Sequence, residues 1–185
     1  MYGKVSPSAK LSVSYPNTEI NEPICYNYSA DKDPRIQWPF GYGLSYTSFE
    51  YKNLKVDKEA STEDMCVNLS FEVSNTGEVA ADEIAQVYLS PTDKKQEIRP
   101  IQLQGFARVK LQPGQTKMVK VRLYTEQFGF YSHQGQRQWN ICPGTFTVGI
   151  GASSADIRLK EKVTLKGQPV IKPLREFYFS ESFVE

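Results

Sequence analysis

The chain has 185 residues, with 22 basic and 21 acidic side chains, 39% hydrophobic residues and 12% aromatic residues. This balance of charge argues against a nucleic-acid or anionic-membrane partner, since either would favour a basic excess. The length suits one ordinary domain, or one domain with part of another, and no apolar run approaches the roughly 20 residues of a transmembrane helix.

Residues 1–37 are rich in turn-forming residues and poor in apolar ones. Leu11 and Val13 alternate with polar neighbours, which predicts one short, half-buried strand, and residues 24–28 can form another. The segment cannot bury enough apolar surface to make a core of its own. We therefore expect it to be a strip of a larger domain.

Residues 38–49, with the sequence WPFGYGLSYTSF, combine aromatic residues with proline and glycine. Pro39 lacks an N–H group and holds Trp38 in an extended conformation. Gly41 and Gly43 permit backbone angles that are closed to other residues. The stretch cannot be a regular helix, and its aromatic mass predicts a buried, irregular hinge between two kinds of sequence.

From Phe49 onward, short runs of alternating apolar and polar residues are separated by turns. Residues 67–73 alternate most regularly, Gly105 predicts a bulge or bend, and residues 113–114 (Pro-Gly) predict a turn. Seven or eight such strands indicate an all-β, immunoglobulin-like antiparallel sandwich. The side chains expected to point into its core are Phe71, Val87, Val121 and Val148.

The end of the chain, residues 166–185, contains two prolines and the aromatic run 177–179. We interpret it as a tail laid over the sandwich by its aromatic side chains, with a functional arm as the alternative. The three cysteines, Cys25, Cys66 and Cys142, form neither a disulfide framework nor a zinc motif. We expect free and mostly buried thiols, although a single bridge is compatible with the count.

Residues suited to catalysis are sparse. The close acidic pairs, residues 31/33 and 82/83, read as solvated loop positions, whereas glycoside hydrolysis needs two positioned carboxylates. His133 is the only histidine, and a lone histidine cannot make a multi-histidine metal site. We therefore assign no catalytic residue, no cofactor-binding residue and no metal ligand.

Four aromatic residues at the entrance to the sandwich are the candidate contact residues. Their flat apolar faces could stack on sugar rings or pack against another domain. The interleaved proline and glycine favour packing between domains. The four are Trp38, Phe40, Tyr42 and Tyr46.

Several motifs occur in one order along residues 2–160. They are residues 3–16 (GKVSPSAKLSVSYP), 39–51 (PFGYGLSYTSFEY), 75–77 (NTG), 86–90 (QVYLS), 103–109 (LQGFARV), 111–114 (LQPG) and 143–154 (PGTFTVGIGASS) followed by Asp156. Together they resemble the C-terminal part of family 3 glycoside hydrolases, the β-glucosidase and β-xylosidase group. The sequence departs from the family pattern at Ala9 and Ser12, where Gly and Pro are usual.

This resemblance implies three segments. Residues 1–45 would be the C-terminal strip of the family's α/β sandwich domain with its linker, residues 46–165 a fibronectin type III-like domain, and residues 166–185 a C-terminal tail. The parent enzyme would hydrolyse terminal β-linked glucose or xylose by a retaining mechanism. Its nucleophilic aspartate would come from an N-terminal barrel that these residues do not include.

The resemblance also implies a scaffold role, in which this portion is inactive alone and braces the catalytic domains of a periplasmic or extracellular parent. An oligo- or polysaccharide is a further candidate partner. The alternatives are a stand-alone carbohydrate-binding or adhesion module and a purely structural spacer. A binding module would present a surface row of aromatic residues on the sandwich itself.

Overall fold

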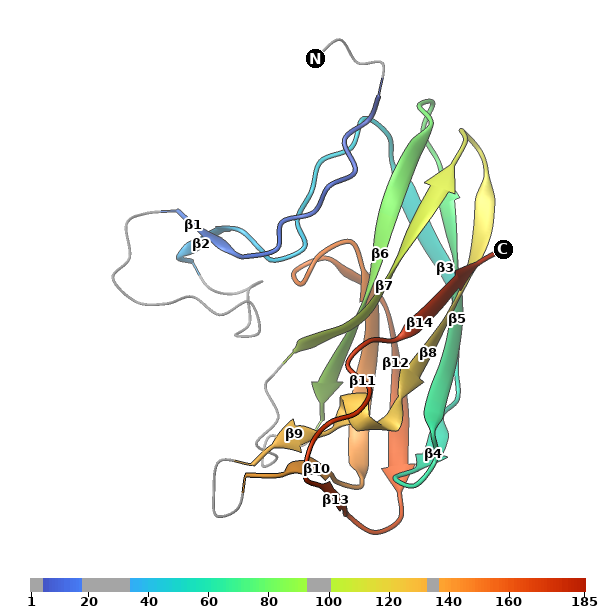
Figure 1. Ribbon diagram of the computed structural model, residues 1–185. Helices are drawn as coiled ribbons and strands as arrows, with labels where there is room; N and C mark the ends of the chain where they lie inside the picture. The colour runs from blue at the N-terminus through green and yellow to red at the C-terminus, as the bar shows by residue number, and fades with distance from the viewer. Residues whose placement is uncertain (1–4, 18–33, 93–100, 133–136) are drawn as a thin grey trace.

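The computed structural model describes residues 5–17, 34–92, 101–132 and 137–185. In these residues it contains strands and one short 3₁₀ helix (Figure 1). In chain order the elements are β1 (Tyr15–Pro16), β2 (Ile36–Trp38), β3 (Phe49–Val56), β4 (Glu59–Ser61), β5 (Cys66–Asn75), β6 (Ala81–Pro91), β7 (Gln102–Leu111), β8 (Thr116–Tyr124), η1 (Thr125–Phe128), β9 (Phe130–Tyr131), β10 (Trp139–Ile141), β11 (Gly144–Gly151), β12 (Ile157–Lys166), β13 (Val170–Lys172) and β14 (Glu181–Val184).

Two sheets make the body of the molecule. One has the strand order β4-β12-β11-β6-β7 and the other β14-β8-β5-β3. The pairing is antiparallel throughout, except that β4 runs parallel to β12. A small sheet, β13-β10-β9, lies at one end, and the β1-β2 ribbon projects from the side (Figure 1). The predicted antiparallel β-sandwich is confirmed.

The core lies between the two sheets, where the apolar phase of each strand points inward. Phe71, Val87, Val121 and Val148 are each at most 1% exposed, so their predicted orientation is confirmed. The ring of Phe71 stacks on that of Tyr51 with centroids 6.3 Å apart. This period-two burial is the physical reason why the register can be read from sequence.

The predicted irregularities fall where the sequence places them. Val87 faces Gly105 and the next residue of β6 faces Leu103, so β7 carries an extra residue at this bulge. At the predicted Pro-Gly turn, Gly114 has φ +72° and the N–H of Gln115 donates to the carbonyl oxygen of Gln112. Gly114 uses the conformational freedom that glycine provides, whereas Gly105 allows a close approach, since a Cβ there would lie 2.3 Å from Oγ of Ser180.

The strand predicted around Leu11 and Val13 is wrong. Leu11 lies in irregular chain, where its N–H donates to the carbonyl of Tyr42 and its carbonyl accepts from the N–H of Gly41. Neighbouring segments override the local alternation here because these backbone groups find partners across the strip. The predictions for residues 24–28, Cys25, residues 31/33 and His133 lie outside the described residues.

The C-terminal segment forms strand pairs with the rest of the chain in addition to side-chain contacts. β13 pairs with β10, and β14 pairs with β8 at the edge of the four-stranded sheet. Phe177 stacks on Tyr124 at 4.1 Å between ring centroids, in keeping with the expected aromatic packing. The boundaries at residues 45/46 and 165/166 stay a prediction.

A buried carboxylate holds the chain between β13 and β14. Glu126, in η1, accepts hydrogen bonds from Lys172 and from the backbone N–H groups of Glu176 and Phe177. Burial alone would raise the pKa of Glu126, but these hydrogen bonds outweigh it and hold the pKa below its ordinary value. The tail is therefore attached by charge as well as by aromatic contact.

Cys66 and Cys142 are free thiols, as expected, although both are half-buried rather than buried. Burial raises the pKa of the Cys142 thiol and makes it a poorer nucleophile at neutral pH. Within the described ranges, no helix is long and apolar enough to cross a membrane.

Candidate functional site at the junction of the strip and the sandwich

The described part of the predicted N-terminal strip, residues 5–17 and 34–45, contacts the sandwich along β6 and the loop after β11. Gln86 is buried on β6, and its Nε2 donates to the carbonyl oxygens of Gly41 (3.0 Å) and Ala152 (2.7 Å). The N–H of Ser154 donates to the carbonyl of Phe40 at 2.9 Å. The strip is therefore held by buried hydrogen bonds as well as by its aromatic side chains.

A cleft of about 450 Å³ lies at this junction and contains the charged side chains of Lys10, Glu83, Asp156 and Arg158. Glu83 is only 3% exposed. Its Oε1 accepts the Tyr51 hydroxyl at 2.7 Å and lies 3.4 Å from Nζ of Lys10. A buried carboxylate is tolerated only when it is paired and hydrogen-bonded, and Glu83 has both kinds of partner.

Arg158 forms the other half of this charged cluster. Its guanidinium forks onto the carboxylate of Asp156, donates to the carbonyl of Phe49 at 2.8 Å, and lies 4.9 Å from the centre of the Tyr51 ring. Burial opposes the charged guanidinium, but the hydrogen bonds and charge of Asp156, with Tyr51 and Glu83, raise the pKa of Arg158. The guanidinium is thus a permanent cation in the cleft.

The pKa of Tyr51 is raised well above its ordinary value, first by burial and then by the charge and hydrogen bond of Glu83. The phenol therefore stays protonated and acts as a hydrogen-bond donor to the carboxylate. Glu83 is engaged by a donor from the sandwich and a cation from the strip. The arrangement is an electrostatic clamp that joins the two segments.

The four predicted aromatic residues do not form one buried cluster. Trp38 and Tyr46 are 42% and 49% exposed, while Phe40 and Tyr42 are half-buried. Trp38 meets Tyr15 edge-on at 6.2 Å, and of the four only Tyr42 lines the junction cleft. The expectation of a buried hinge is wrong for this chain, because the strip leaves one side of the stretch open to solvent.

Sequence reasoning missed the charged clamp. Asp82 and Glu83 were expected to be solvated loop residues, but both lie in β6 and only Asp82 is on the outer side, paired with Arg108 at 2.7 Å. The alternation along β6 does indicate the burial of Glu83, since Glu83 lies two and four residues before Ala85 and Val87, which point into the core. Among the described residues, no three of His, Cys, Asp and Glu gather closely enough to hold a metal ion.

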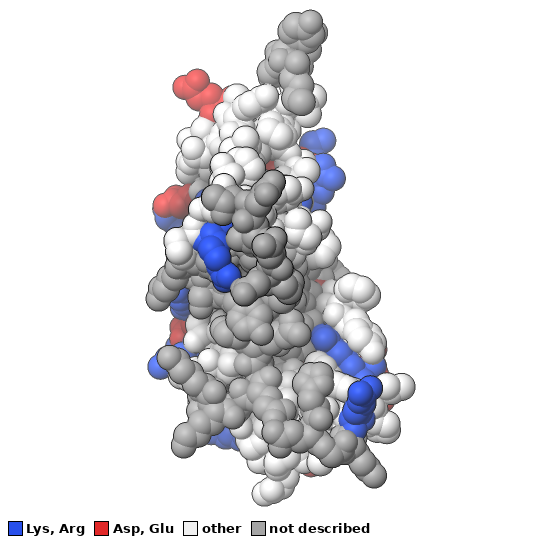
Figure 2. Space-filling view, turned by 90° about the vertical axis from the view of Figure 1, so that its left-hand side faces the viewer, with Lys and Arg blue, Asp and Glu red and all other residues white. Residues whose placement is uncertain are grey.

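The face that carries the strip bears few charged side chains among the described residues. Figure 2 shows them scattered, with neither sign gathered into one patch. Among the described residues, this face therefore offers neither a basic nor an acidic patch.

The fold and this junction define a fibronectin type III-like β-sandwich with an attached N-terminal strip. A family model described as a fibronectin type III-like domain matches residues 83–154. The chain is 34% identical to thermostable β-glucosidase B of Acetivibrio thermocellus, over 93% of this chain and 25% of that protein. It is 33% identical to a β-xylosidase of Formosa agariphila, over 86% of this chain and 23% of that protein.

Solved structures agree with these sequence matches. The β-glucosidase of Kluyveromyces marxianus in complex with glucose superposes with a TM-score of 0.80 at 29% identity, over 92% of this chain and 22% of that chain. The GH3 β-glucosidase of Bifidobacterium adolescentis gives 0.76 at 31% identity, over 89% of this chain and 27% of that chain. The chain spans about a quarter of the length of these relatives, and it corresponds to the C-terminal part of a family 3 glycoside hydrolase.

Proposed function

We propose that this chain is the non-catalytic scaffold portion of a β-glucosidase-like enzyme, in which it braces the catalytic domains. The parent enzyme would release terminal β-linked glucose or xylose by a retaining, two-carboxylate mechanism. The observation that carries the proposal is the match to a quarter of several β-glucosidases and a β-xylosidase, at about one third identity.

The geometry of the strip supports the same role. Trp38 and Tyr46 expose about half of their surfaces, and Leu44 is 66% exposed. Large apolar side chains that stand together in solvent mark an interaction surface. The strip, clamped to the sandwich by Lys10 and Glu83, presents these side chains on a fixed support, which is what a brace requires.

The chain alone would not hydrolyse glycosides. Glu83 and Asp156 share the junction cleft, but each is already engaged by a cation within the protein. A glycosidase needs one carboxylic acid that donates a proton and one free carboxylate that attacks. The pair therefore serves as a structural clamp rather than as a catalytic dyad.

The test compares the 185 residues with the protein encoded by the complete genomic reading frame. We expect the longer protein to hydrolyse aryl β-glucosides or β-xylosides and the 185 residues to give no turnover. Turnover by the 185 residues that survives repurification and a mock-expression control would refute the scaffold assignment. So would a reading frame that encodes no further domain.

A stand-alone carbohydrate-binding module is the second candidate. Exposed aromatic rings do occur on the sandwich, at Phe106 on β7 and Phe183 on β14. Phe183 stands beside a polar hollow, which is the specific observation that favours a saccharide contact. Such a contact is compatible with the scaffold role, because it uses a different face of the molecule from the strip.

A further inference from the structure

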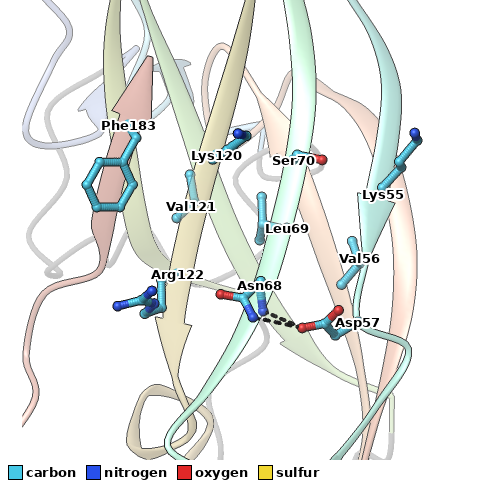
Figure 3. Close-up of a pocket in the computed structure, with 10 residues that line it drawn as sticks. All are labelled: Lys55, Val56, Asp57, Asn68, Leu69, Ser70, Lys120, Val121, Arg122 and Phe183. Carbon is cyan, nitrogen blue, oxygen red and sulfur yellow. Dashed lines mark hydrogen bonds between the residues drawn. The ribbon is translucent and has the colours of Figure 1, made fainter. Parts of the chain in front are cut away.

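The outer face of the four-stranded sheet carries a hollow of about 410 Å³ (Figure 3). Two rows of side chains cross the strands there. In the first, Phe183 faces Lys120, Lys120 faces Ser70, and Ser70 faces Lys55. Because Ser70 is short and its neighbours are long, the centre of the row is depressed. The volume lies within the range of small-molecule sites.

The second row supplies planar polar groups. Arg122 faces Asn68 across β8 and β5, and Asp57 lies beyond Asn68. One oxygen of Asp57, Oδ2, accepts the backbone N–H and the Nδ2 of Asn68, both at 3.0 Å. These bonds fix the amide and the carboxylate in place and do not use the Oδ1 atom of either residue. The Oδ1 of Asn68 has a long contact of 4.0 Å with the thiol of Cys66.

A bulge in β3 brings one side chain of each row, Lys55 and Asp57, to the outer face. Asn53 has φ +56°, and the register with β5 shifts between Lys52 and Lys55. Without the extra residue, strict alternation from buried Tyr51 would turn Lys55 and Asp57 toward the core. The bulge re-aims both side chains to the outer face, beside Asn68 and Ser70.

The charges around the hollow balance. Lys120 pairs with Glu185 at 2.7 Å and Arg122 with Glu181 at 3.0 Å, so β14 and the residue after it neutralise two of the three cations. Asp57 offsets the third, Lys55, which has no ion-pair partner in the part of the chain that the structure describes. Because neither sign of charge is in excess around the hollow, a charged ligand would gain no net electrostatic attraction there. The hollow is thus suited to an uncharged ligand with many hydroxyl groups.

We infer that this hollow binds a neutral oligosaccharide as an ancillary, non-catalytic site. Neighbouring sugar hydroxyls are each donor and acceptor, and the fixed amide, carboxylate and guanidinium offer both functions side by side. The Phe183 ring, 52% exposed, provides the flat apolar surface on which the axial C–H face of a pyranose packs. The site needs only this chain and is independent of the scaffold role of the strip.

The test titrates the 185-residue chain with cellohexaose and xylohexaose by calorimetry, and with oligogalacturonate as the charged comparator. We expect the neutral hexamers to bind and the uronate to bind more weakly. Phe183→Ala should weaken binding about tenfold, because loss of the ring removes the apolar surface on which the sugar stacks, and a tenfold change in Kd corresponds to about 1.4 kcal/mol. Lys55→Ala, which removes an exposed side chain and leaves folding intact, should also weaken it.

Two matched variants serve as controls. Phe179→Ala removes an 82% exposed ring outside the hollow, and Ser74→Ala removes a polar group of β5 farther along the same face. Both should bind as the parent chain does. Equal losses in the control variants, stronger binding of the uronate, or a Kd above about 10 mM for every saccharide would overturn the inference. Aryl glycosidase activity of the complete protein does not enter this test, so its absence would leave the result unaffected.

Discussion

Lys10 is predicted to hold the strip on the sandwich. Its Nζ lies 3.4 Å from the buried Glu83 carboxylate, and the two side chains are 15% and 5% exposed. In Lys10→Met the stem still packs, but the charge is gone. Removal of one partner of a buried ion pair costs about 3–5 kcal/mol. Because Arg158 remains close to Glu83 and still offsets its charge, we expect a cost below that range, about 2 kcal/mol.

The loss should appear in the docking of the strip and not in the sandwich. When the strip opens, water reaches Glu83 and relieves the cost of leaving its carboxylate unpaired. The destabilisation caused by Lys10→Met therefore cannot exceed the free energy with which the strip docks on the sandwich. Native-state hydrogen exchange reads this directly through three amides: Leu11 and Gly41 within the strip, and Ser154 bonded to Phe40. A docking loss of about 2 kcal/mol accelerates their exchange roughly 30-fold.

The control is Lys52→Met. Lys52 pairs with Glu50 at 2.8 Å, but both side chains are about half exposed, so the expected change is below about 0.5 kcal/mol. Unchanged exchange at Leu11, Gly41 and Ser154 in Lys10→Met would refute the clamp. Equal acceleration in β5 would instead show that strip and sandwich unfold as one unit.

Three further predictions concern the core, the tail and the junction. Phe71→Ala should cost about 3–5 kcal/mol in chemical denaturation, since the ring is fully buried, and Glu72→Ala about 0.5 kcal/mol or less; the reverse ranking would mean a wrong register. The folded-state pKa of Glu126 lies below its unfolded value of about 4.3, so its contribution to stability is complete above that pH and is lost as pH falls through the folded pKa. Urea unfolding between about pH 5 and pH 3 should show a loss of stability that is smaller in Glu126→Gln, and an equal loss in the two proteins would contradict this role. Gly41→Ala should destabilise strip docking by more than about 1 kcal/mol, because φ is +78° and the new Cβ would meet Oε1 of Gln86 at 2.0 Å; unaltered exchange at Ser154 would contradict this.

The sandwich could be predicted from sequence because its strands obey a local rule. In β5 every second residue from Val67 to Val73 is buried, so the alternation of residue type reports the face directly. β6 shows where this rule ends. Gln86 and Tyr88 sit on the polar phase yet are buried, since the strip covers that side of the strand. No pattern within β6 records a partner 45 residues upstream.

The charged groups were harder to place for the same reason. Asp57 and Lys55 reach the outer face only because of the bulge at Asn53. The sequence carries a signal there, since Asn tolerates positive φ and the apolar spacing changes from two residues to three between Tyr51 and Leu54, but this signal does not say which side chains of the other strands lie opposite. The hollow itself joins four strands that lie far apart in sequence. Local propensity can fix which residues face inward, whereas a site assembled across strands depends on register, which long-range pairing decides.

The position of β14 at the end of the chain sets when the four-stranded sheet can be completed during synthesis on the ribosome. β14 completes the four-stranded sheet by pairing with β8, yet Glu181 follows Tyr124 by 57 residues. At about 5–20 residues per second, β8 would emerge some 3–11 seconds before the strand that covers its edge. During that interval its open backbone groups can pair with a neighbouring nascent chain. β8 carries Lys120 and Arg122, which later line the hollow, and charged side chains on an exposed edge disfavour such pairing.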